Sequence, residues 1–171
     1  HQSVAACIDG MLKLSPMGPT DRTLLVSSFT SDATTTNIWL TYTVGAGLYV
    51  YPKHQILGEL PRLFTTHLIT YCDITASLMG TLPVEAGASF RVAHCAGEAL
   101  PAALLDTWVD RLILVNAYGP TEAAVNATLQ ICSRNMRYKT SIGRPLPHVA
   151  CYVLVPRGRE SQPIGVPGEL C

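Results

Sequence analysis

The fold is decided by Leu112-Ile113-Leu114-Val115-Asn116-Ala117-Tyr118-Gly119-Pro120-Thr121-Glu122. The first four residues of this stretch are aliphatic, which is typical of a buried strand. Gly119-Pro120 is a turn dipeptide, and the residues from Thr121 to Ala124 are compatible with a helix. The stretch therefore predicts a strand, a turn and a helix in succession, which is the repeating unit of an α/β fold.

Similar units precede this stretch along the chain. Apolar and β-branched runs predict strands at 23–28, 47–51, 69–73, 90–95 and 112–116, and the segments around them predict helices at about 3–14, 35–44, 56–67, 76–82 and 101–109. This alternation predicts a mostly parallel sheet flanked by helices. Beyond Asn116, the segments 127–132 and 150–155 look like strands separated by turns rich in proline and glycine. They predict a second, more antiparallel sheet.

The composition narrows the possible partners. The chain has 171 residues, of which 48% are apolar and only 14% charged, and its formal net charge is zero. Such a chain can bury a real core, and it lacks the basic stripe that neutralises nucleic-acid phosphates. Its apolar runs are much shorter than the roughly 20 residues that cross a bilayer. We therefore expect a soluble protein with neither nucleic acid nor membrane as a partner.

The six cysteines are scattered without a C-x-x-C pair. This spacing predicts small buried side chains rather than metal ligands or nucleophiles, and a reduced, cytoplasmic location. The chain begins at His1 without an initiator methionine, and it ends at Cys171 just as a strand-like segment begins. Both ends are therefore expected to be cut from a longer sequence.

The turn around Gly119 carries the chemistry. A strand–turn–helix unit would place the Thr121 hydroxyl and the Glu122 carboxylate at the carboxyl edge of the sheet, where α/β folds bind ligands. Thr121 can donate to a phosphate oxygen, Glu122 can hold Mg²⁺, and Tyr118 offers a face for stacking a base. The plainer alternative is a simple turn in which Thr121 caps the helix and Glu122 lies in its first turn.

The seven residues from Asn116 to Glu122 resemble, residue for residue, the core motif of nonribosomal peptide synthetase adenylation domains, which form an adenylate from ATP and an acid. Further similar segments follow the family's order along essentially the whole chain: Asp21-Arg22, Ser27-Ser28-Phe29, Asp32, Ala96-Gly97-Glu98-Ala99-Leu100, Ile142-Gly143-Arg144-Pro145 and Gly165-Val166-Pro167-Gly168-Glu169-Leu170-Cys171. Ala96 stands where the family has a glycine.

The resemblance implies that residues 1–171 are a partial adenylation (AMP-binding) domain. In the family a phosphate loop precedes the position of His1, while a ribose-binding aspartate and a catalytic lysine lie beyond Cys171. The chain would then be the central part of the large N-terminal subdomain, without the small C-terminal subdomain. These 171 residues alone are expected to be inactive in ATP–pyrophosphate exchange.

The resemblance also implies the reaction. An amino acid would be activated by ATP and Mg²⁺ as an aminoacyl-AMP and passed to the phosphopantetheine of a carrier domain, with peptidyl carrier and condensation domains as partners. Thr121 would lie near the α-phosphate, Glu122 would hold Mg²⁺, and Asn116 and Tyr118 would lie at adenine. The nucleotide site implied in this way comprises Gly97, Asn116, Ala117, Tyr118, Gly119 and Thr121.

The amino-acid pocket is implied by the same resemblance. Asp32 would pair with the substrate α-ammonium, although by its residue type it is equally compatible with capping a helix. The implied pocket comprises Asp32, Ala33, Thr36, Asp73, His94, Ala96, Ala117, Val125 and Asn126. Asp73 and His94 end neighbouring predicted strands, and their polarity predicts a hydrogen-bonding or cationic substrate side chain. The alternatives are a helix cap near Thr75 for Asp73 and a core histidine for His94.

Two rival functions stay open. An acyl-CoA or aryl-acid ligase of the same superfamily would share the turn, but its substrates lack the amine that would pair with Asp32. A non-catalytic nucleotide-binding remnant would share the scaffold.

Overall fold

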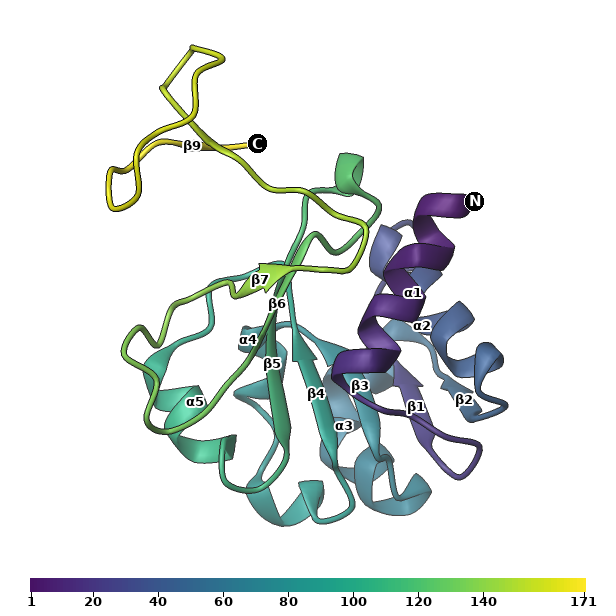
Figure 1. The fold of residues 1–171 in the computed structure, drawn as a ribbon. Coiled ribbons are helices and arrows are strands. Elements are labelled where there is room, and N and C mark those ends of the chain that lie inside the picture. Colours follow the sequence, from purple (N-terminus) through teal and green to yellow (C-terminus); the bar gives the residue numbers. More distant parts are fainter.

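The computed structural model describes all residues from His1 to Cys171 and is built on a seven-stranded sheet with the order β2-β1-β3-β4-β5-β6-β7 (Figure 1). The strands are β1 (Arg22–Leu25), β2 (Gly47–Val50), β3 (Tyr71–Ile74), β4 (Val92–Cys95), β5 (Ile113–Tyr118), β6 (Thr128–Ile131) and β7 (Arg144–Pro145). The strands β1 to β5 run parallel to one another, whereas β6 pairs antiparallel with β5 and β7 antiparallel with β6. The prediction of a mostly parallel sheet is confirmed.

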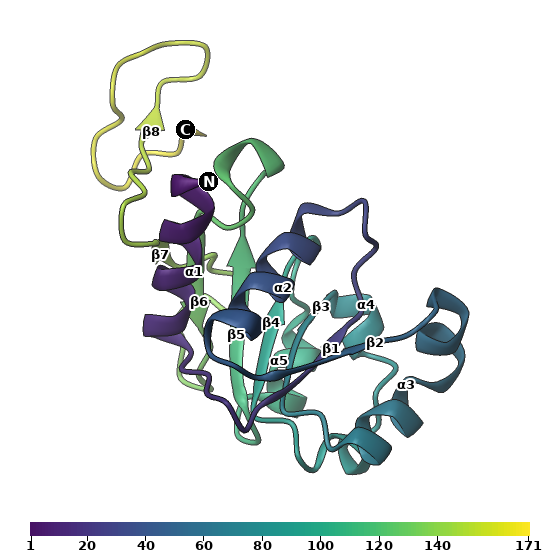
Figure 2. The same cartoon turned by 90° about the vertical axis from the view of Figure 1, so that its right-hand side faces the viewer.

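Helices cover both faces of this sheet (Figures 1 and 2). One face is packed by α1 (Gln2–Leu14) and α2 (Asp32–Thr43), and the other by α3 (Lys53–His67), α4 (Ala76–Met79) and α5 (Ala102–Trp108). The predicted helices are all present, although α4 has four residues where seven were expected. In α3 the backbone leaves helical geometry at Glu59, next to the internal Pro61, which cannot donate a backbone hydrogen bond.

The strand predicted at 127–132 was assigned to the wrong sheet. It is β6, which lies antiparallel beside β5 in the main sheet, with Ala117 opposite Leu129. The short connection from Tyr118 to Thr128 explains this, because only a long crossover would return the chain parallel to β5. The separate antiparallel sheet exists as β8 (Val153–Leu154) and β9 (Glu169–Leu170), away from the main sheet in Figures 1 and 2.

The helix predicted after Gly119-Pro120 is also wrong. Thr121–Ala123 forms a single 3₁₀ turn, and then Ala124 and Val125 take positive φ angles of 59° and 79°. A left-handed residue ends a helical turn, so the chain reverses into β6 instead of propagating a helix. A turn this short aligns too few peptide dipoles to attract an anion as a helix N-terminus would.

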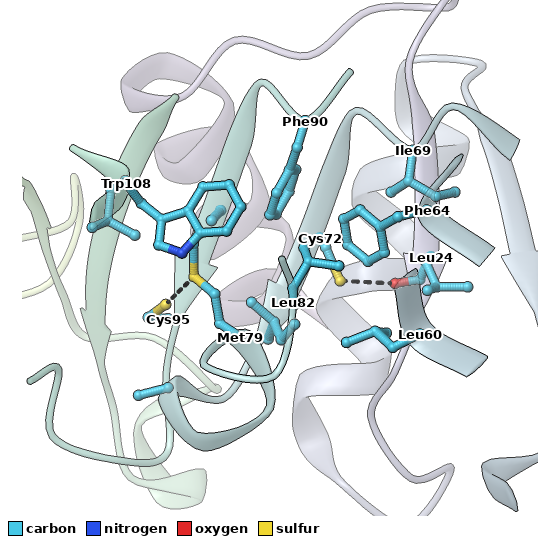
Figure 3. Close-up of a cluster of buried hydrophobic side chains, with 14 of the residues drawn as sticks. Leu24, Leu60, Phe64, Ile69, Cys72, Met79, Leu82, Phe90, Cys95 and Trp108 are labelled. Carbon is cyan, nitrogen blue, oxygen red and sulfur yellow. Dashed lines mark hydrogen bonds between the residues drawn. The ribbon is translucent and has the colours of Figure 1, made fainter. Parts of the chain in front are cut away.

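The larger core lies between the sheet and α3, α4 and α5 (Figure 3). Phe90 packs edge-on against Phe64 and Trp108, with ring centroids 4.9 and 6.2 Å away. Three cysteines belong to this core, namely Cys72, Cys95 and Cys132. The Cys95 thiol is 3.4 Å from the Met79 sulfur, and the Cys72 thiol donates to the Leu24 carbonyl at 3.3 Å. All six cysteines are free, and four of them are buried as predicted, the fourth being Cys7 in the smaller core. The prediction is wrong for Cys151, which is half-buried, and for Cys171, which is exposed.

The smaller core lies between the sheet and α1 and α2, around Met11, Leu40 and Tyr71. Side chains alternate between the two faces of a strand. Because Cys72 and Ile74 face the larger core, Asp73 shares the α1 and α2 face with Tyr71. None of the helices combines the length and the apolar composition needed to cross a membrane.

Candidate functional site

Two cavities lie at the carboxyl ends of the parallel strands. The inner cavity, of about 160 Å³, is lined by Ser27, Ser31, Asp32, Ala33, Asp73, Ile74, Thr75, Ala96, Gly97, Gly119, Val125 and Asn126. The outer cavity, of about 440 Å³, is lined by Gly97, Glu98, Ala99, Leu100, Asn116, Ala117, Tyr118, Gly119, Pro120, Thr140 and Ile142. The two share Gly97 and Gly119, so groups bound in the two cavities would meet beside these glycines.

The backbone geometry explains why both shared residues are glycine. A Cβ atom on Gly119 would lie 2.2 Å from the Val125 carbonyl oxygen and 2.7 Å from the Ala127 nitrogen, so the turn is packed against backbone. Gly97 has a φ of +79°, which L residues rarely adopt, and a Cβ there would meet no atom within 4 Å. The junction of the cavities therefore depends on the absence of side chains.

Asp32 is the first residue of α2 and contributes a carboxylate to the inner cavity. Ser31 occupies the N-cap position, so Asp32 is not the helix cap that was its alternative role. Its Oδ1 accepts the Ala33 backbone N–H at 2.8 Å, and it forms no ion pair within the chain. The inner cavity thus offers a negative charge without a cationic partner.

Asp73 and His94 lie side by side on β3 and β4, where the strand register pairs them directly. The Asn37 amide donates to Asp73 Oδ2 at 3.0 Å, and Ser15 Oγ lies 2.7 Å from His94 Nε2. The remaining atoms, Asp73 Oδ1 and His94 Nδ1, are 3.4 Å apart and have no hydrogen-bond partner. Thr75 caps α4 by accepting the Leu78 N–H at 3.3 Å, so Asp73 does not serve as that cap.

Burial shifts the pKa of both groups toward the neutral form. Desolvation raises the pKa of Asp73 to about 7, against a smaller lowering by the hydrogen bond from Asn37. Desolvation lowers the pKa of His94 to about 3. His94 is therefore uncharged at neutral pH, and its contact with Asp73 is not an ion pair.

These shifts predict opposite pH dependences of stability in two variants. Because its pKa is raised in the folded state, Asp73 stabilises the fold fully when the pH is below 3.8, its ordinary pKa. This contribution is lost as the pH rises to about 7. His94 contributes above its ordinary pKa of 6.5 and loses that contribution as pH falls toward 3. Asp73→Asn should therefore become more stable as pH rises from 4 to 6.5, and His94→Gln less stable, each by up to about 1.4 kcal/mol per pH unit.

Urea unfolding at half-unit pH steps measures these slopes. The free energy of unfolding of the wild type should vary least with pH, because the contributions of Asp73 and His94 oppose each other between pH 4 and about 6.5. Slopes of the same sign in both variants would contradict the assigned shifts.

Six of the residues implied for the amino-acid pocket line the inner cavity: Asp32, Ala33, Asp73, Ala96, Val125 and Asn126. Ala117 instead lines the outer cavity together with Asn116 and Tyr118. Thr36 and His94 are fully buried and line neither cavity, and the Thr36 hydroxyl donates to the Ala33 carbonyl at 2.9 Å. They lie in the layer of side chains behind the cavity wall.

The outer cavity combines an exposed aromatic ring with a fixed amide. The ring of Tyr118 is partly exposed, and the Asn116 amide donates to the Ser141 carbonyl at 2.9 Å. Glu98 accepts hydrogen bonds from the Ser77 backbone N–H and hydroxyl, which holds the following loop against α4. This cavity can accept a flat ring against Tyr118.

Thr121 and Glu122 are exposed and lie outside the lining of both cavities, directly after Gly119-Pro120. No group of three or more histidine, cysteine, aspartate or glutamate side chains is placed to hold a metal ion. Glu122 has no ion-pair partner in the chain. A single free carboxylate fits Mg²⁺, because this ion takes one or two carboxylates and completes its shell with phosphates and water.

Several residues of the site were not predicted from the sequence. They are Ser27, Ser31, Ile74 and Thr75 at the inner cavity, and Ser15 and Asn37 behind it. Helical spacing was an available signal for Asn37, which lies four residues after Ala33 on the same face of α2. Ser15 carried no such signal, because its partner His94 is 79 residues away in sequence.

The fold and the cavities define a class of protein, namely an α/β protein whose ligands bind at the carboxyl edge of a parallel sheet. The sequence model of the family described as AMP-binding enzyme matches residues 1–171. The chain belongs to this family.

Curated relatives include two synthases. Tyrocidine synthase 3 of Brevibacillus parabrevis is 31% identical over 180 residues, which cover 100% of this chain and 3% of that protein. Chondramide synthase of Chondromyces crocatus is 31% identical over 182 residues, covering 99% of this chain and 5% of that protein. The chain therefore spans a small part of the length of these relatives.

Solved structures share the fold. An adenylation domain of Vibrio cholerae in complex with glycyl-adenosine-5'-phosphate matches with a TM-score of 0.82 and 24% identity, over 98% of this chain and 34% of that one. The structure of IdnL1 matches with a TM-score of 0.85 and 22% identity, over 98% of this chain and 37% of that one. The resemblance to adenylation domains and the fold class are confirmed.

Proposed function

We propose that this chain provides the substrate pockets of an enzyme that activates an amino acid with ATP as an aminoacyl-AMP, for loading onto the phosphopantetheine of a carrier domain. One observation carries the proposal. An inner cavity with an unpaired carboxylate, Asp32, joins an outer cavity beside Tyr118 at two glycines. The family match supports the same function, as do curated relatives that are named as nonribosomal peptide synthetases.

The amino acid occupies the inner cavity in this proposal. Asp32 binds its α-ammonium, which leaves the substrate carboxylate directed toward Gly119. A carboxylic acid without the amine would leave Asp32 unpaired in a desolvated site, which is costly. The polar wall formed by Asp73 and Asn126 favours a side chain that donates hydrogen bonds.

ATP occupies the outer cavity, with adenine against Tyr118 and Asn116. The α-phosphate then lies at the junction, where the amino-acid carboxylate attacks it and pyrophosphate leaves. Thr121 donates to a phosphate oxygen. The chain acts by positioning two reactants, which can supply much of the rate enhancement of such a step. Glu122 would hold Mg²⁺, which neutralises charge on the phosphates.

ATP–pyrophosphate exchange tests this function directly. This assay and the exchange measurements described below should use the complete adenylation domain that contains residues 1–171, because these residues alone are expected to be inactive. A panel of amino acids is tested, each beside the matched acid that lacks the α-amine. Exchange that depends on one or a few amino acids, with no response to the matched acids, is the expected result. Exchange driven by an aryl or fatty acid would instead favour the acyl-CoA or aryl-acid ligase, and no exchange with any acid would favour a nucleotide-binding remnant.

Replacing Glu122 by glutamine should raise the Mg²⁺ concentration needed for half-maximal exchange by about tenfold or more. The amide keeps the shape of the side chain but loses the charge that the metal uses. Amino-acid binding, measured without turnover, should change little because Glu122 lies outside the inner cavity. Equal losses in magnesium dependence and in amino-acid binding would show a purely structural glutamate.

A further inference from the structure

A chain of polar side chains runs behind the inner cavity, from α1 to β4 to β3. It consists of Ser15, His94 and Asp73, with contacts of 2.7 Å between Ser15 Oγ and His94 Nε2 and 3.4 Å between His94 Nδ1 and Asp73 Oδ1. Ser15 is 1% exposed, His94 0% and Asp73 7%. Only Asp73 lines the cavity, so the other two act on a ligand through it.

The Ser15 hydroxyl has two possible partners and a single hydrogen. Its Oγ lies 3.0 Å from the Met11 carbonyl oxygen and 2.7 Å from His94 Nε2. The Met11 carbonyl also accepts the Ser15 backbone N–H at 2.9 Å, so it does not depend on the hydroxyl. The hydroxyl is therefore free to donate either to Met11 or to His94.

Each choice fixes the histidine tautomer. When Ser15 donates to Met11, its oxygen accepts the Nε2–H of His94, and Nδ1 becomes an acceptor facing Asp73. When Ser15 donates to His94 Nε2, the imidazole proton lies on Nδ1 and is directed at Asp73. The two states thus demand a protonated and an ionised Asp73, respectively, and they differ by one proton.

Both states place one proton between Asp73 Oδ1 and His94 Nδ1. Both of these atoms lack a hydrogen-bond partner, as four other buried side-chain atoms do, among them Asn37 Oδ1 and the Tyr71 hydroxyl. A buried polar atom without a partner costs about 1–3 kcal/mol. A proton on either atom satisfies both. Asn37 holds the other carboxylate oxygen through its amide in either state, so Asp73 does not need to move.

We propose that Ser15, His94 and Asp73 form a one-proton relay behind the amino-acid cavity, in which Ser15 is a positioning residue that sets the His94 tautomer and thereby the charge that Asp73 presents to the substrate side chain. Deprotonation makes the cavity wall anionic and suited to a cationic side chain. Protonation makes the wall neutral.

Other titratable groups around Asp73 do not compete for the proton near neutral pH. Burial raises the pKa of Cys7 on α1, of Tyr71 and Cys72 on β3, and of Cys95 on β4, so all four are neutral. Asp32 lines the same cavity from α2, and in the proposed function it pairs with the substrate amine. The raised pKa of Asp73, about 7, places the transition of the relay within the physiological range.

A hydrolase triad has the same order of hydroxyl, imidazole and carboxylate. The burial of Ser15 distinguishes this arrangement from a hydrolase triad, because no substrate carbonyl reaches an oxygen on a side chain that is 1% exposed. The relay therefore transmits a proton position and carries out no covalent step.

Nitrogen-15 NMR of the histidine rings tests the relay without any substrate. In the protein labelled at histidine, with His94 assigned by its loss in His94→Gln, the Nε2–H tautomer should dominate at pH 5. The Nδ1–H tautomer should dominate at pH 9, with the midpoint near pH 7. One tautomer throughout this range would overturn the relay, whatever the protein activates.

Variants of Asp73 and Ser15 distinguish a proton relay from a purely structural role of these side chains. Asp73→Asn cannot titrate and should keep a single tautomer from pH 5 to 9. Ser15→Ala removes the acceptor of the Nε2–H and should move the midpoint to lower pH, because a buried N–H is costlier to leave unpaired than a ring nitrogen lone pair. Ser15→Thr keeps the hydroxyl and should restore the midpoint. A midpoint that is the same in Ser15→Ala and the wild type would overturn the role of Ser15.

The consequence for substrate choice rests on the proposed function and has its own measurement. L-ornithine and L-norvaline share a carbon skeleton, and only ornithine carries a side-chain ammonium. The ratio of their dissociation constants should change about tenfold per pH unit below pH 7, in favour of ornithine as pH rises, and then level off. A tautomer switch with a pH-independent ratio would uphold the relay and overturn its role in selectivity.

Discussion

Replacing Asp32 by alanine is expected to lower amino-acid-dependent ATP–pyrophosphate exchange about a hundred- to a few-thousand-fold for every amino acid tested. The reason is that every amino acid carries the α-ammonium that Asp32 binds in the proposed site. Removing one partner of a desolvated charge pair costs roughly 3–5 kcal/mol, which corresponds to this range. Asp32 has no cation of its own in the chain, so its loss should not break an internal ion pair.

The control is a change at the same cavity that leaves the amine site intact. Val125→Ala trims the cavity wall and should change the ranking among amino acids while the best substrate keeps most of its activity. Thermal unfolding of both variants should show that they fold. An Asp32→Ala variant that loses activity with only some amino acids would contradict the role of Asp32 as the amine site.

Replacing Gly119 by alanine should reduce exchange at least about a hundredfold, with all substrates and at saturating ATP. The new Cβ would overlap the Val125 carbonyl oxygen, which belongs to backbone and cannot rotate away. The turn must move, and both cavities move with it because they share this residue. A displacement of about 1 Å between reactants is enough for a loss of this size.

Gly58→Ala is the matched control for this change. Gly58 lies in α3, and a Cβ there would meet no atom within 4 Å. This variant should keep wild-type exchange, and its thermal stability should equal or slightly exceed that of the wild type, because alanine favours a helix more than glycine does. The Gly119 variant should unfold at lower temperature, since overpacking of this kind costs roughly 1–3 kcal/mol. Exchange within a few-fold of wild type in Gly119→Ala would contradict the assignment of the cavity junction.

The parallel part of the fold was predictable because its signals are local. The apolar run from Leu112 to Val115 is typical of a buried strand, and the same pattern recurs at regular intervals toward the N-terminus. The paired positions of Asp73 and His94 also followed from the strand pattern. The resemblance implied Asp32 for the amino-acid pocket and Gly119 for the nucleotide site, and in the structure both residues line the inner cavity.

What could not be predicted depends on backbone conformation and on contacts distant in sequence. Thr121 to Ala124 is a good helical sequence, but positive φ angles at Ala124 and Val125 end it after one turn. Such angles in alanine and valine are imposed by the surrounding structure rather than by local preference. The contact of Ser15 with His94 is likewise invisible in sequence, because it arises only when α1 packs on the sheet.

The most direct test of amino-acid adenylation is to identify the products that the complete domain containing residues 1–171 makes from ATP and an amino acid in the presence of Mg²⁺. Mass spectrometry should detect an amino acid joined to AMP, together with pyrophosphate, and neither should form from the matched acid that lacks the α-amine. Formation of ADP and phosphate, or of an adenylate from the acid without the amine, would contradict the proposed amino-acid adenylation.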